Sequence, residues 1–389
     1  MTTAALTVRH PGELRWETRL LGVVVLTLLV FGLASAYGAA TAQTRGAGLT
    51  VMLRQLSGAA IGGIILVTLA RIDYRLWQRA AWLLLAITVL LLVIPIVPGT
   101  YAVAPVINGA RRWIRLPGGL SVQPSELARL VIVIWCAMLA AKKGEVVRGF
   151  KKGVVPFLVI IGLVSGLILL EPNMSMAALV ALCGAVVLFT AGAKIGHFLL
   201  LGIVTALIGV QAILMAPYRL RRLQAFIDPG EALPGARDQI TESVIGVGAG
   251  GPFGVGFGEG QQKFHLPYAY SDFLFSTIAE EWGFLGVLLV VVLFSLFCWL
   301  GFRIARTAVD DFGRYLAAGL TATVGFTAFL HMGVSLGLMP TTGLTLPFMS
   351  YGRTSLIISL AGAGMLINVG RMRGRPAQKR GKGTVSGER

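Results

Sequence analysis

Three carboxylates lie close together in a chain that holds few of them. Asp272, Glu280 and Glu281 fall within ten positions, whereas the 389 residues contain only 17 Asp and Glu in total. A carboxylate beside long apolar runs is costly unless it has a function or a partner. Two roles are open for Asp272: a general base, or with Ser271 a cap for the following helix. We expect Glu280 and Glu281 to be buried acids with hydrogen-bond or ion-pair partners.

A second group of polar residues surrounds the start of the apolar run near residue 126. The group comprises Arg111, Arg112, Trp113, Ser125, Glu126 and Arg129. Ser125 has the side chain of a helix cap. Arg129 lies one turn inside the expected helix, where a cation needs an acidic partner or an anionic ligand. We expect Glu280 or Glu281 to supply that partner.

Further cations appear in two later stretches. Arg219, Arg221 and Arg222 open a long polar segment, and Lys263 follows in GEGQQK. Guanidinium groups suit phosphate or pyrophosphate, and a surface that contacts solvent or lipid headgroups is the alternative.

The stretch from 343 to 355 reads GLTLPFMSYGRTS and contains Ser350 and Arg353. Its proline and glycines predict non-helical backbone before the last helix, a feature tolerated at membrane depth where it lines a cavity.

The glycine-rich stretch 246–260 contains a formal GxGxxG match. No strand-helix-strand unit surrounds it and no phosphate-loop lysine follows, so a nucleotide site is disfavoured. We expect an irregular, closely packed loop, because glycine adopts backbone conformations that other residues do not.

The composition of the chain indicates which kind of fold holds these residues in place. With 56% apolar and 13% charged residues, the chain would expose too much hydrocarbon as a soluble protein. We expect an all-α polytopic membrane protein with a single domain over 1–370. Ten runs approach membrane length, at about 20–40, 52–70, 80–97, 126–141, 154–170, 174–192, 196–216, 274–301, 315–338 and 350–369.

Charge assigns the two sides of the membrane. If both termini are cytoplasmic, the inner segments hold 22 of the 34 basic residues and 7 of the 17 acids. This asymmetry follows the positive-inside rule and accounts for the net charge of +17 without a nucleic-acid partner. The segments 98–125 and 217–273 become outer loops, with the larger one between helices 7 and 8. The tail 371–389 is basic, and we expect it to be disordered and to contact membrane lipids.

The motifs, in this order, resemble the SEDS family of cell-wall proteins, which includes RodA, FtsW and sporulation relatives. The resemblance covers about residues 19–370 and is carried by NGARRWI, QPSELARL, EPNMS, GAGGPFGVGFGEGQQK, SDFLF, AEEWGFLG and GLTLPFMSYGRTS. GEGQQK and GLTLPF are nearer to the division member, FtsW.

The chain also departs from the family pattern. Tyr270 and Ser271 replace the usual His-Thr before the essential acid, which falls on Asp272. Arg129 replaces a common lysine and keeps its charge, whereas Asn173 replaces an acid and loses one. Arg353 adds a cation where the family has glycine.

The resemblance implies a peptidoglycan glycosyltransferase of the bacterial inner membrane that polymerises lipid II, with its active site on the outer face. Asp272 would be the base. The residues that would bind the substrate and its pyrophosphate are Arg111, Arg112, Trp113, Arg129, Arg219, Arg221, Arg222 and Lys263. A supporting role would fall to Ser125, Glu126, Glu280, Glu281, Ser350 and Arg353. A class B penicillin-binding protein and other division proteins are the implied partners, and a divalent Mg or Mn ion the implied cofactor. No acidic cluster with metal-like spacing is visible. A lipid II flippase, an elongation-type polymerase and a non-catalytic scaffold are the alternatives.

Overall fold

The computed structural model describes residues 15–43, 48–107, 109–117, 120–215 and 236–372, together with Leu220 and Phe226. The described chain is mainly helical. Its long helices are α1 (Arg15–Gln43), α2 (Gly48–Leu69), α3 (Arg75–Val93), α4 (Pro124–Lys143), α5 (Val155–Leu170), α6 (Met174–Thr190), α7 (Ile195–Leu214), α10 (Leu274–Arg306), α11 (Asp311–Ser335) and α12 (Arg353–Met372). A shorter helix, α9 (Ala236–Ala249), precedes α10.

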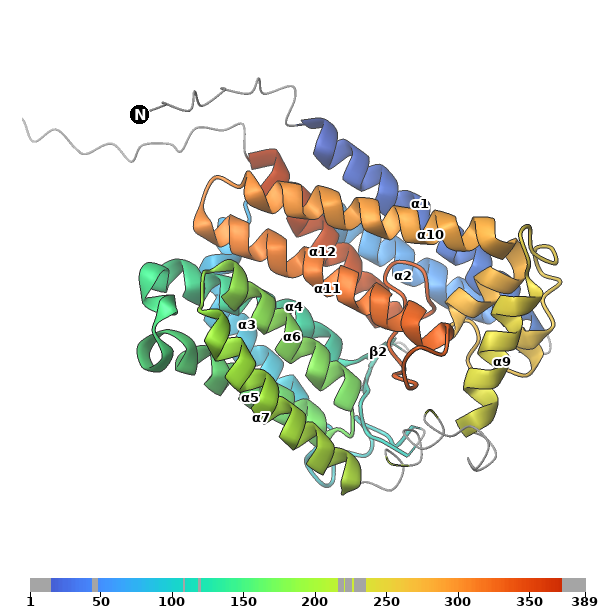
Figure 1. The fold of residues 1–389 in the computed structure, drawn as a ribbon, viewed down its shortest axis with the longest axis horizontal. Coiled ribbons are helices and arrows are strands. Elements are labelled where there is room, and N and C mark those ends of the chain that lie inside the picture. Colours follow the sequence, from blue (N-terminus) through green and yellow to red (C-terminus); the bar gives the residue numbers. More distant parts are fainter. Residues whose placement is uncertain are drawn as a thin grey trace, which may run out of the picture.

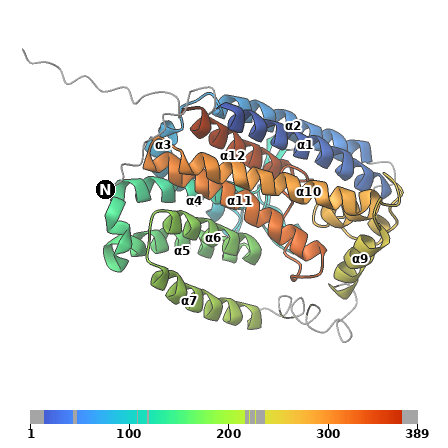
Figure 2. The same ribbon diagram turned by 45° about the horizontal axis from the view of Figure 1, so that its top comes forward.

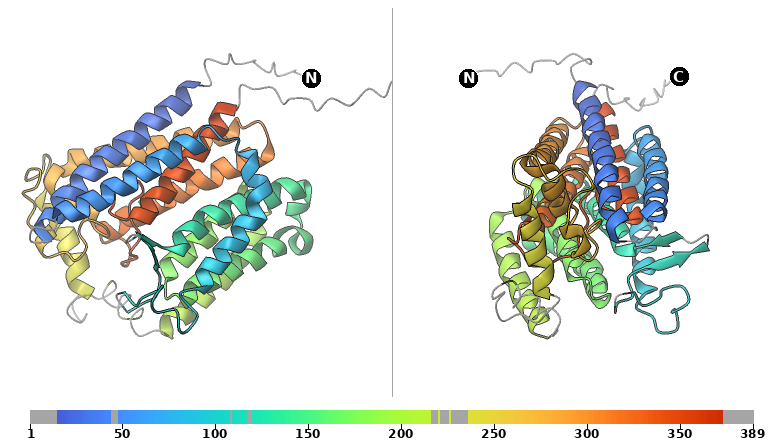
Figure 3. Two further views of the ribbon diagram at one scale, coloured as in Figure 1. Left: turned by 180° about the vertical axis from the view of Figure 1, so that it is seen from behind. Right: turned by 90° about the vertical axis from the view of Figure 1, so that its right-hand side faces the viewer.

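The helices run side by side between two ends of the molecule. The start of α1 and the end of α12 share one end, and α9 with the loops around it lies at the other (Figures 1 and 3). Thr18 contacts Gly370 at the first end, where a Cβ atom built on Gly370 would lie 2.4 Å from the Thr18 methyl group. We call these the terminal end and the loop end.

Each of the ten predicted segments overlaps a helix. Within the described chain, seven helices are long and apolar enough to cross a membrane: α1, α2, α3, α5 extended back to Phe150, α10, α11 and α12. Helix α6 is apolar but has only 17 residues. Helix α4 carries Glu126 and Arg129 in its first two turns and two lysines in its last. The number of ten membrane crossings therefore stays a prediction. The predicted tail lies outside the described residues from 373 onward.

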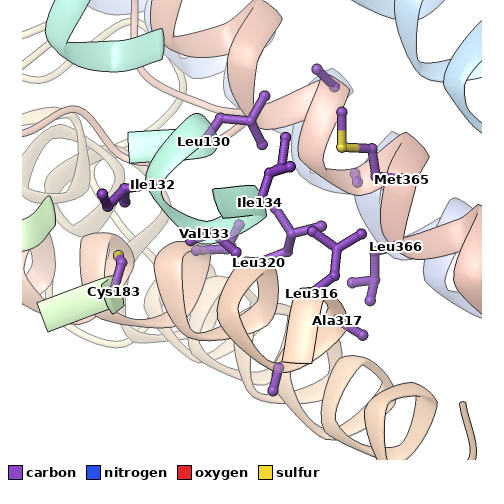
Figure 4. Packing of buried hydrophobic residues seen from close by; sticks show 14 of the residues in the cluster. Leu130, Ile132, Val133, Ile134, Cys183, Leu316, Ala317, Leu320, Met365 and Leu366 are labelled. Atoms are coloured by element: carbon purple, nitrogen blue, oxygen red, sulfur yellow. The ribbon is translucent and has the colours of Figure 1, made fainter. Parts of the chain in front are cut away.

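The bundle has two groups of helices, which are distinguished in Figure 2. Helix α12 packs against α2, and α10 packs against both α1 and α11. On the other side α4 packs against α3 and α6, while α11 connects the groups through contacts with α4 and α6. Apolar side chains meet at this junction, where Leu130, Val133 and Ile134 of α4 face Leu316 and Leu320 of α11 and Leu366 of α12 (Figure 4). The many close contacts among these apolar side chains stabilise the packed bundle.

Two loop segments differ from the sequence expectation. The loop before α4 contains a short antiparallel pair, β1 (Ile114–Leu116) and β2 (Leu120–Val122), with Ile114 opposite Val122. The alternation of apolar and polar residues over these three-residue strands is too short to stand out in the sequence. Within the predicted outer loop, α9 extends to Ala249, so the first glycines of the 246–260 stretch are helical. The remainder, from Gly250, is irregular as expected.

Helix α10 is broken at Gly283, which has φ 63° and ψ −160°. A Cβ atom at Gly283 would lie 2.3 Å from the backbone nitrogen of Gly254. A Cβ atom at Gly254 would in turn lie 2.2 Å from the carbonyl oxygen of Glu281. Since any side chain would prevent this approach, the two glycines allow the loop backbone to lie directly on α10. The break leaves Glu280 and Glu281 on a short first section of the helix.

A cluster of polar side chains at the terminal end joins three segments of the chain by hydrogen bonds. The Tyr74 hydroxyl donates to Asp310 Oδ2 at 2.7 Å, and Arg75 Nε pairs with the same oxygen at 2.9 Å. Asp310 Oδ1 accepts from the backbone nitrogen of Gly313 at 2.7 Å and so caps α11. The amide of Asn368 on α12 accepts from the Tyr74 nitrogen at 2.9 Å and donates to the carbonyl of Ala70 at 3.1 Å. The α2–α3 turn, the start of α11 and the end of α12 are thereby joined.

We expect Asp310→Ala to destabilise the fold by about 2 kcal/mol, since it removes a helix cap and leaves the buried Tyr74 hydroxyl without its acceptor. The thermal unfolding midpoint in detergent should fall. Asp311→Ala is the matched control, because Asp311 is well exposed and its contact with Arg314 measures 3.7 Å. Equal midpoints for the two variants would contradict this role of Asp310.

Candidate functional site

Asp272 lies at the loop end on a tight turn that immediately precedes α10. The backbone nitrogens of Ser271 and Asp272 both donate to the carbonyl of Tyr268 at 2.9 Å. The Ser271 hydroxyl donates to Asp272 Oδ1 at 3.0 Å. Tyr268 has φ 59°, a left-handed conformation that is strained for a tyrosine and persists only where surrounding contacts fix it.

The helix-cap hypothesis for this segment is wrong. The N-cap of α10 is Phe273, and no side chain caps the helix there. Ser271 and Asp272 instead bond within the turn, and Asp272 is half-buried. The role of Asp272 as a general base stays a prediction.

The non-helical segment before α12 packs against the Asp272 turn. Ser350 Oγ donates to the carbonyl of Ser271 at 2.7 Å, and the Tyr351 nitrogen donates to the carbonyl of Tyr270 at 3.0 Å. The rings of Tyr270 and Tyr351 meet edge to face at 5.3 Å between centroids. Ser350, predicted to have a supporting role, thus lies against the candidate base.

The same segment passes close to the carboxylate itself. A Cβ atom built on Gly343 would lie 3.9 Å from Asp272 Oδ2. His331 of α11 is buried and its Nδ1–H donates to the carbonyl of Leu344 at 2.8 Å. This histidine was missed from the sequence, although a lone polar residue in an apolar run is a usable signal. Arg353 begins α12, and its stem lies against Gly58 of α2.

Glu280 and Glu281 hold the glycine-rich loop and do not contact Arg129. Glu280 Oε1 accepts from the backbone nitrogens of Gln261 and Gln262 at 2.7 and 3.1 Å. Glu281 Oε1 pairs with Lys263 Nζ at 2.9 Å, and both side chains are almost completely buried. Lys263 also donates to the carbonyls of Gly38 and Gly258. The expectation of buried, partnered acids is confirmed, but the predicted arginine partner is wrong.

Arg129 finds its acid within its own helix. Its Nη2 pairs with Glu126 Oε2 at 3.0 Å, one turn earlier on α4, and donates to Ser359 Oγ of α12 at 3.0 Å. Both charged side chains are at most 6% exposed. The i, i+3 spacing of Glu126 and Arg129 was visible in the sequence and made this pair available.

Ser125 does not cap α4, contrary to the sequence hypothesis. Gln123 occupies the N-cap, again without a capping side chain, and Pro124 is the first helical residue. The Ser125 hydroxyl is buried, with no hydrogen-bond partner in the described chain. A buried hydroxyl without a partner is costly.

Two arginines just before β1 hydrogen-bond to neighbouring backbone. Arg111 donates to the carbonyls of Ala104 and Val97 at 3.0 and 3.1 Å and lies over the Tyr101 ring at 4.4 Å. Arg112 donates to the carbonyl of Glu171 at 3.0 Å. These two residues and Trp113 are half-buried. Arg219, Arg221 and Arg222 lie outside the described residues.

The EPNMS stretch between α5 and α6 contains a buried acid. Burial raises the pKa of Glu171 from its ordinary value of 4.5 to about 8, although the charge of Arg112 opposes this shift. Both carboxyl oxygens lack hydrogen-bond partners among the described residues. Asn173 caps α6 by accepting from the Met176 nitrogen at 3.4 Å.

The expected divalent ion needs a set of ligands, which the described residues could supply in part or in full. Within those residues, no three His, Cys, Asp or Glu side chains come together in a way that would hold a metal. The divalent ion stays a prediction, because one or two carboxylates together with the oxygens of a pyrophosphate can also hold Mg²⁺.

Comparison with known sequences identifies relatives over nearly the full chain. Residues 18–374 match the FtsW/RodA/SpoVE family, described as cell cycle proteins. The chain is 38% identical over 366 residues to a probable peptidoglycan glycosyltransferase FtsW from Trichlorobacter lovleyi, covering 93% of this chain and 95% of that one. It is 37% identical over 356 residues to stage V sporulation protein E from Bacillus subtilis, covering 90% and 96%.

Solved structures agree with these relatives. A chain from a peptidoglycan synthase complex that coordinates polymerization and crosslinking matches with a TM-score of 0.77 and 29% identity, over 92% of this chain and 98% of that one. The rod shape determining protein RodA of Thermus thermophilus matches with a TM-score of 0.68 and 27% identity, over 92% and 97%.

We expect Lys263→Met to destabilise the protein by about 3–5 kcal/mol, because it leaves the buried Glu281 carboxylate without its cation. The double variant Lys263→Met, Glu281→Gln removes both charges and should recover most of the loss. Thermal unfolding in detergent measures both. A double variant no more stable than Lys263→Met would contradict the ion pair as the reason for the loss.

Glu171 should make the protein less stable as pH rises from about 4.5 to 8. In this window the folded protein retains a proton that the unfolded chain has released, so each increase in pH favours unfolding. The full effect, on the order of a few kcal/mol, is reached above pH 8. Glu171→Gln should abolish this part of the pH dependence in thermal unfolding between pH 5 and 9. Parallel curves for the variant and the wild type would contradict a raised pKa.

Proposed function

Because this chain belongs to the FtsW/RodA/SpoVE family, we propose that it is a peptidoglycan glycosyltransferase that polymerises lipid II into glycan strands. The observation that carries the proposal is the position of Asp272. This acid is half-buried and lies at the loop end, on a turn that contains the strained Tyr268. Ser271 donates a hydrogen bond to its carboxylate, and Ser350 donates one to the carbonyl of Ser271 in the same turn. A carboxylate fixed in this way is suited to proton transfer.

The proposed reaction is a single inverting displacement. Asp272 accepts the proton of the GlcNAc 4-hydroxyl of one lipid II as that oxygen bonds to the anomeric carbon of MurNAc in another. The bond from that carbon to the pyrophosphate breaks, and undecaprenyl pyrophosphate leaves with the electron pair. An α-linked donor gives a β-linked product. Pyrophosphate is a good leaving group, so one carboxylate suffices where glycosidases use two.

The turn geometry supports Asp272 in this role. The Ser271 hydroxyl bonds Oδ1, which fixes the carboxylate plane. Oδ2 lies on the side of Gly343, where a built Cβ atom would already be in van der Waals contact with the oxygen at 3.9 Å. An acceptor hydroxyl must approach within hydrogen-bond distance of the base, and bulk at residue 343 would obstruct that approach.

Charge on the leaving group calls for cations nearby. Arg111, Arg112, Arg353 and the 219–222 set are the candidates that we propose for the pyrophosphate. Arg129 and Lys263 each have a buried carboxylate partner that offsets their charge. We therefore propose that these two act mainly by positioning, with Glu126, Ser125, Glu280 and Glu281.

We place the loop end outside the cytoplasmic membrane and both termini inside. The excess of basic residues in the terminal-end segments supports this orientation. We further propose a role in division with a class B penicillin-binding protein as partner. The FtsW relatives and the likeness to a chain of a peptidoglycan synthase complex support the role and the partnership.

Asp272→Asn should lower the rate of glycan synthesis from lipid II at least about 100-fold, since an amide cannot accept the proton. The assay uses purified protein with its penicillin-binding partner. Glu259→Gln is the matched control: Glu259 is an exposed carboxylate of the same loop, and its loss should leave the rate unchanged.

Full activity of Asp272→Asn would overturn the base assignment. If neither wild type nor variant made glycan but both moved lipid II across vesicle membranes, the protein would be a transporter. Normal glycan synthesis by the partner alone would identify a scaffold.

A further inference from the structure

A glutamine of α2 contacts the segment that supports Asp272. Gln55 lies within an apolar helix and is only 1% exposed. Its Nε2 donates to the carbonyl of Ser350 at 3.0 Å, and its Oε1 accepts from the Gly352 nitrogen at 3.2 Å. Both polar ends of the carboxamide are used, and both partners are backbone groups outside regular helix.

The backbone segment that Gln55 contacts does not supply all of its own hydrogen-bond partners. The chain from 340 to 352 is not helical, and Phe348 has φ 65°, a strained value for a residue with a side chain. Internal support comes from Ser350, whose Oγ accepts from the Leu346 nitrogen at 3.0 Å. Buried polar groups of the backbone are costly without partners, so the two bonds from Gln55 stabilise this particular conformation.

The support continues from this segment to the candidate base. Ser350 donates to the carbonyl of Ser271, the residue before Asp272. Tyr351, between the two residues that Gln55 binds, donates to the carbonyl of Tyr270. A continuous set of hydrogen bonds therefore leads from Gln55 through Ser350 and Tyr351 to the Asp272 turn.

We propose that Gln55 is a positioning residue for the transferase reaction, acting through Ser350 and Tyr351 on Asp272. The inference rests on the proposed function of Asp272. Gln55 contacts backbone and not substrate, so its loss should affect the alignment of the base more than the affinity for lipid II. Small misplacements of a reacting group are known to cost rate strongly.

The Gln55 carboxamide donates at one end and accepts at the other, so substitutions can remove both hydrogen bonds or only one. Gln55→Met keeps the length of the side chain and removes both bonds. Gln55→Glu keeps an acceptor for the Gly352 nitrogen, but an ionised carboxylate cannot donate to the Ser350 carbonyl. When protonated, the same glutamic acid can donate. The Glu variant should therefore regain kcat as pH falls. A role in folding alone would instead change the fraction of folded protein, which the thermal unfolding midpoint measured at each pH reports.

The experiment measures kcat and KM for lipid II between pH 5.5 and 8.5, with the protein bound to its penicillin-binding partner. We expect Gln55→Met to lower kcat about 10- to 100-fold with KM within about twofold. The ratio of Gln55→Glu to wild-type kcat should rise at least about fivefold from pH 8.5 to 5.5. Thr88→Val is the control, because the buried Thr88 hydroxyl of α3 bonds only the carbonyl of Leu84 in its own helix.

The outcomes separate this inference from the proposed function. If Asp272→Asn is inactive while Gln55→Met retains wild-type kcat, the inference fails and the function stands. A loss in Gln55→Met that appears equally in Thr88→Val, or a flat kcat ratio for Gln55→Glu, also overturns it. Full activity of Asp272→Asn removes the base on which the inference rests, so both then fail.

Discussion

Backbone that leaves the helix inside an apolar bundle must find its hydrogen-bond partners within the protein, and the loop end of this molecule is organised by that requirement. The segment 340–352 and the turn before α10 are both non-helical, and each supplies partners for the other through Ser350 and Tyr351. Neither could hold its conformation alone. The candidate base lies where the two meet, so its position is fixed by bonds that are needed in any case to satisfy buried backbone.

Buried charges at the same end follow a related rule. Glu281 with Lys263, and Glu126 with Arg129, are paired at 2.9 and 3.0 Å almost without solvent contact. Glu280 uses its carboxylate on two backbone amides of the glycine-rich loop. Such groups are weak evidence of stability, because desolvation offsets much of their attraction. Their consequence here is definite geometry: Glu280 and the Lys263–Glu281 pair connect the glycine-rich loop to α10, and Arg129 connects α4 to α12.

The helices were predictable from sequence, whereas the role of Asp272 as the base remains a proposal. Apolar runs of membrane length define helices with little regard to context, and Asp272 falls on a family motif. The partners were harder. Arg129 was expected to pair with Glu280 or Glu281. Glu126 lies one turn away on the same helix, so the helix itself places the two side chains next to each other. Caps at Ser125 and Ser271 were wrong because neighbouring residues occupy those positions. Gln55 and His331 each stand out as a polar residue in an apolar run. The neighbouring sequence, however, does not indicate which backbone groups they bind, because those groups come from other segments of the chain.

The separation of these partners along the chain bears on how the protein is made. Gln55 bonds a segment 295 positions later, and the Tyr74 nitrogen bonds Asn368 at a separation of 294. Since the N-terminal part of a chain is synthesised first, α2 enters the bilayer long before α12 exists. Throughout that interval the carboxamide of Gln55 lacks its native partners in a nonpolar setting. Helix α2 must then be accommodated by lipid, water or the insertion machinery until the last helix arrives, so completion of the C-terminal helix is the step that closes the fold.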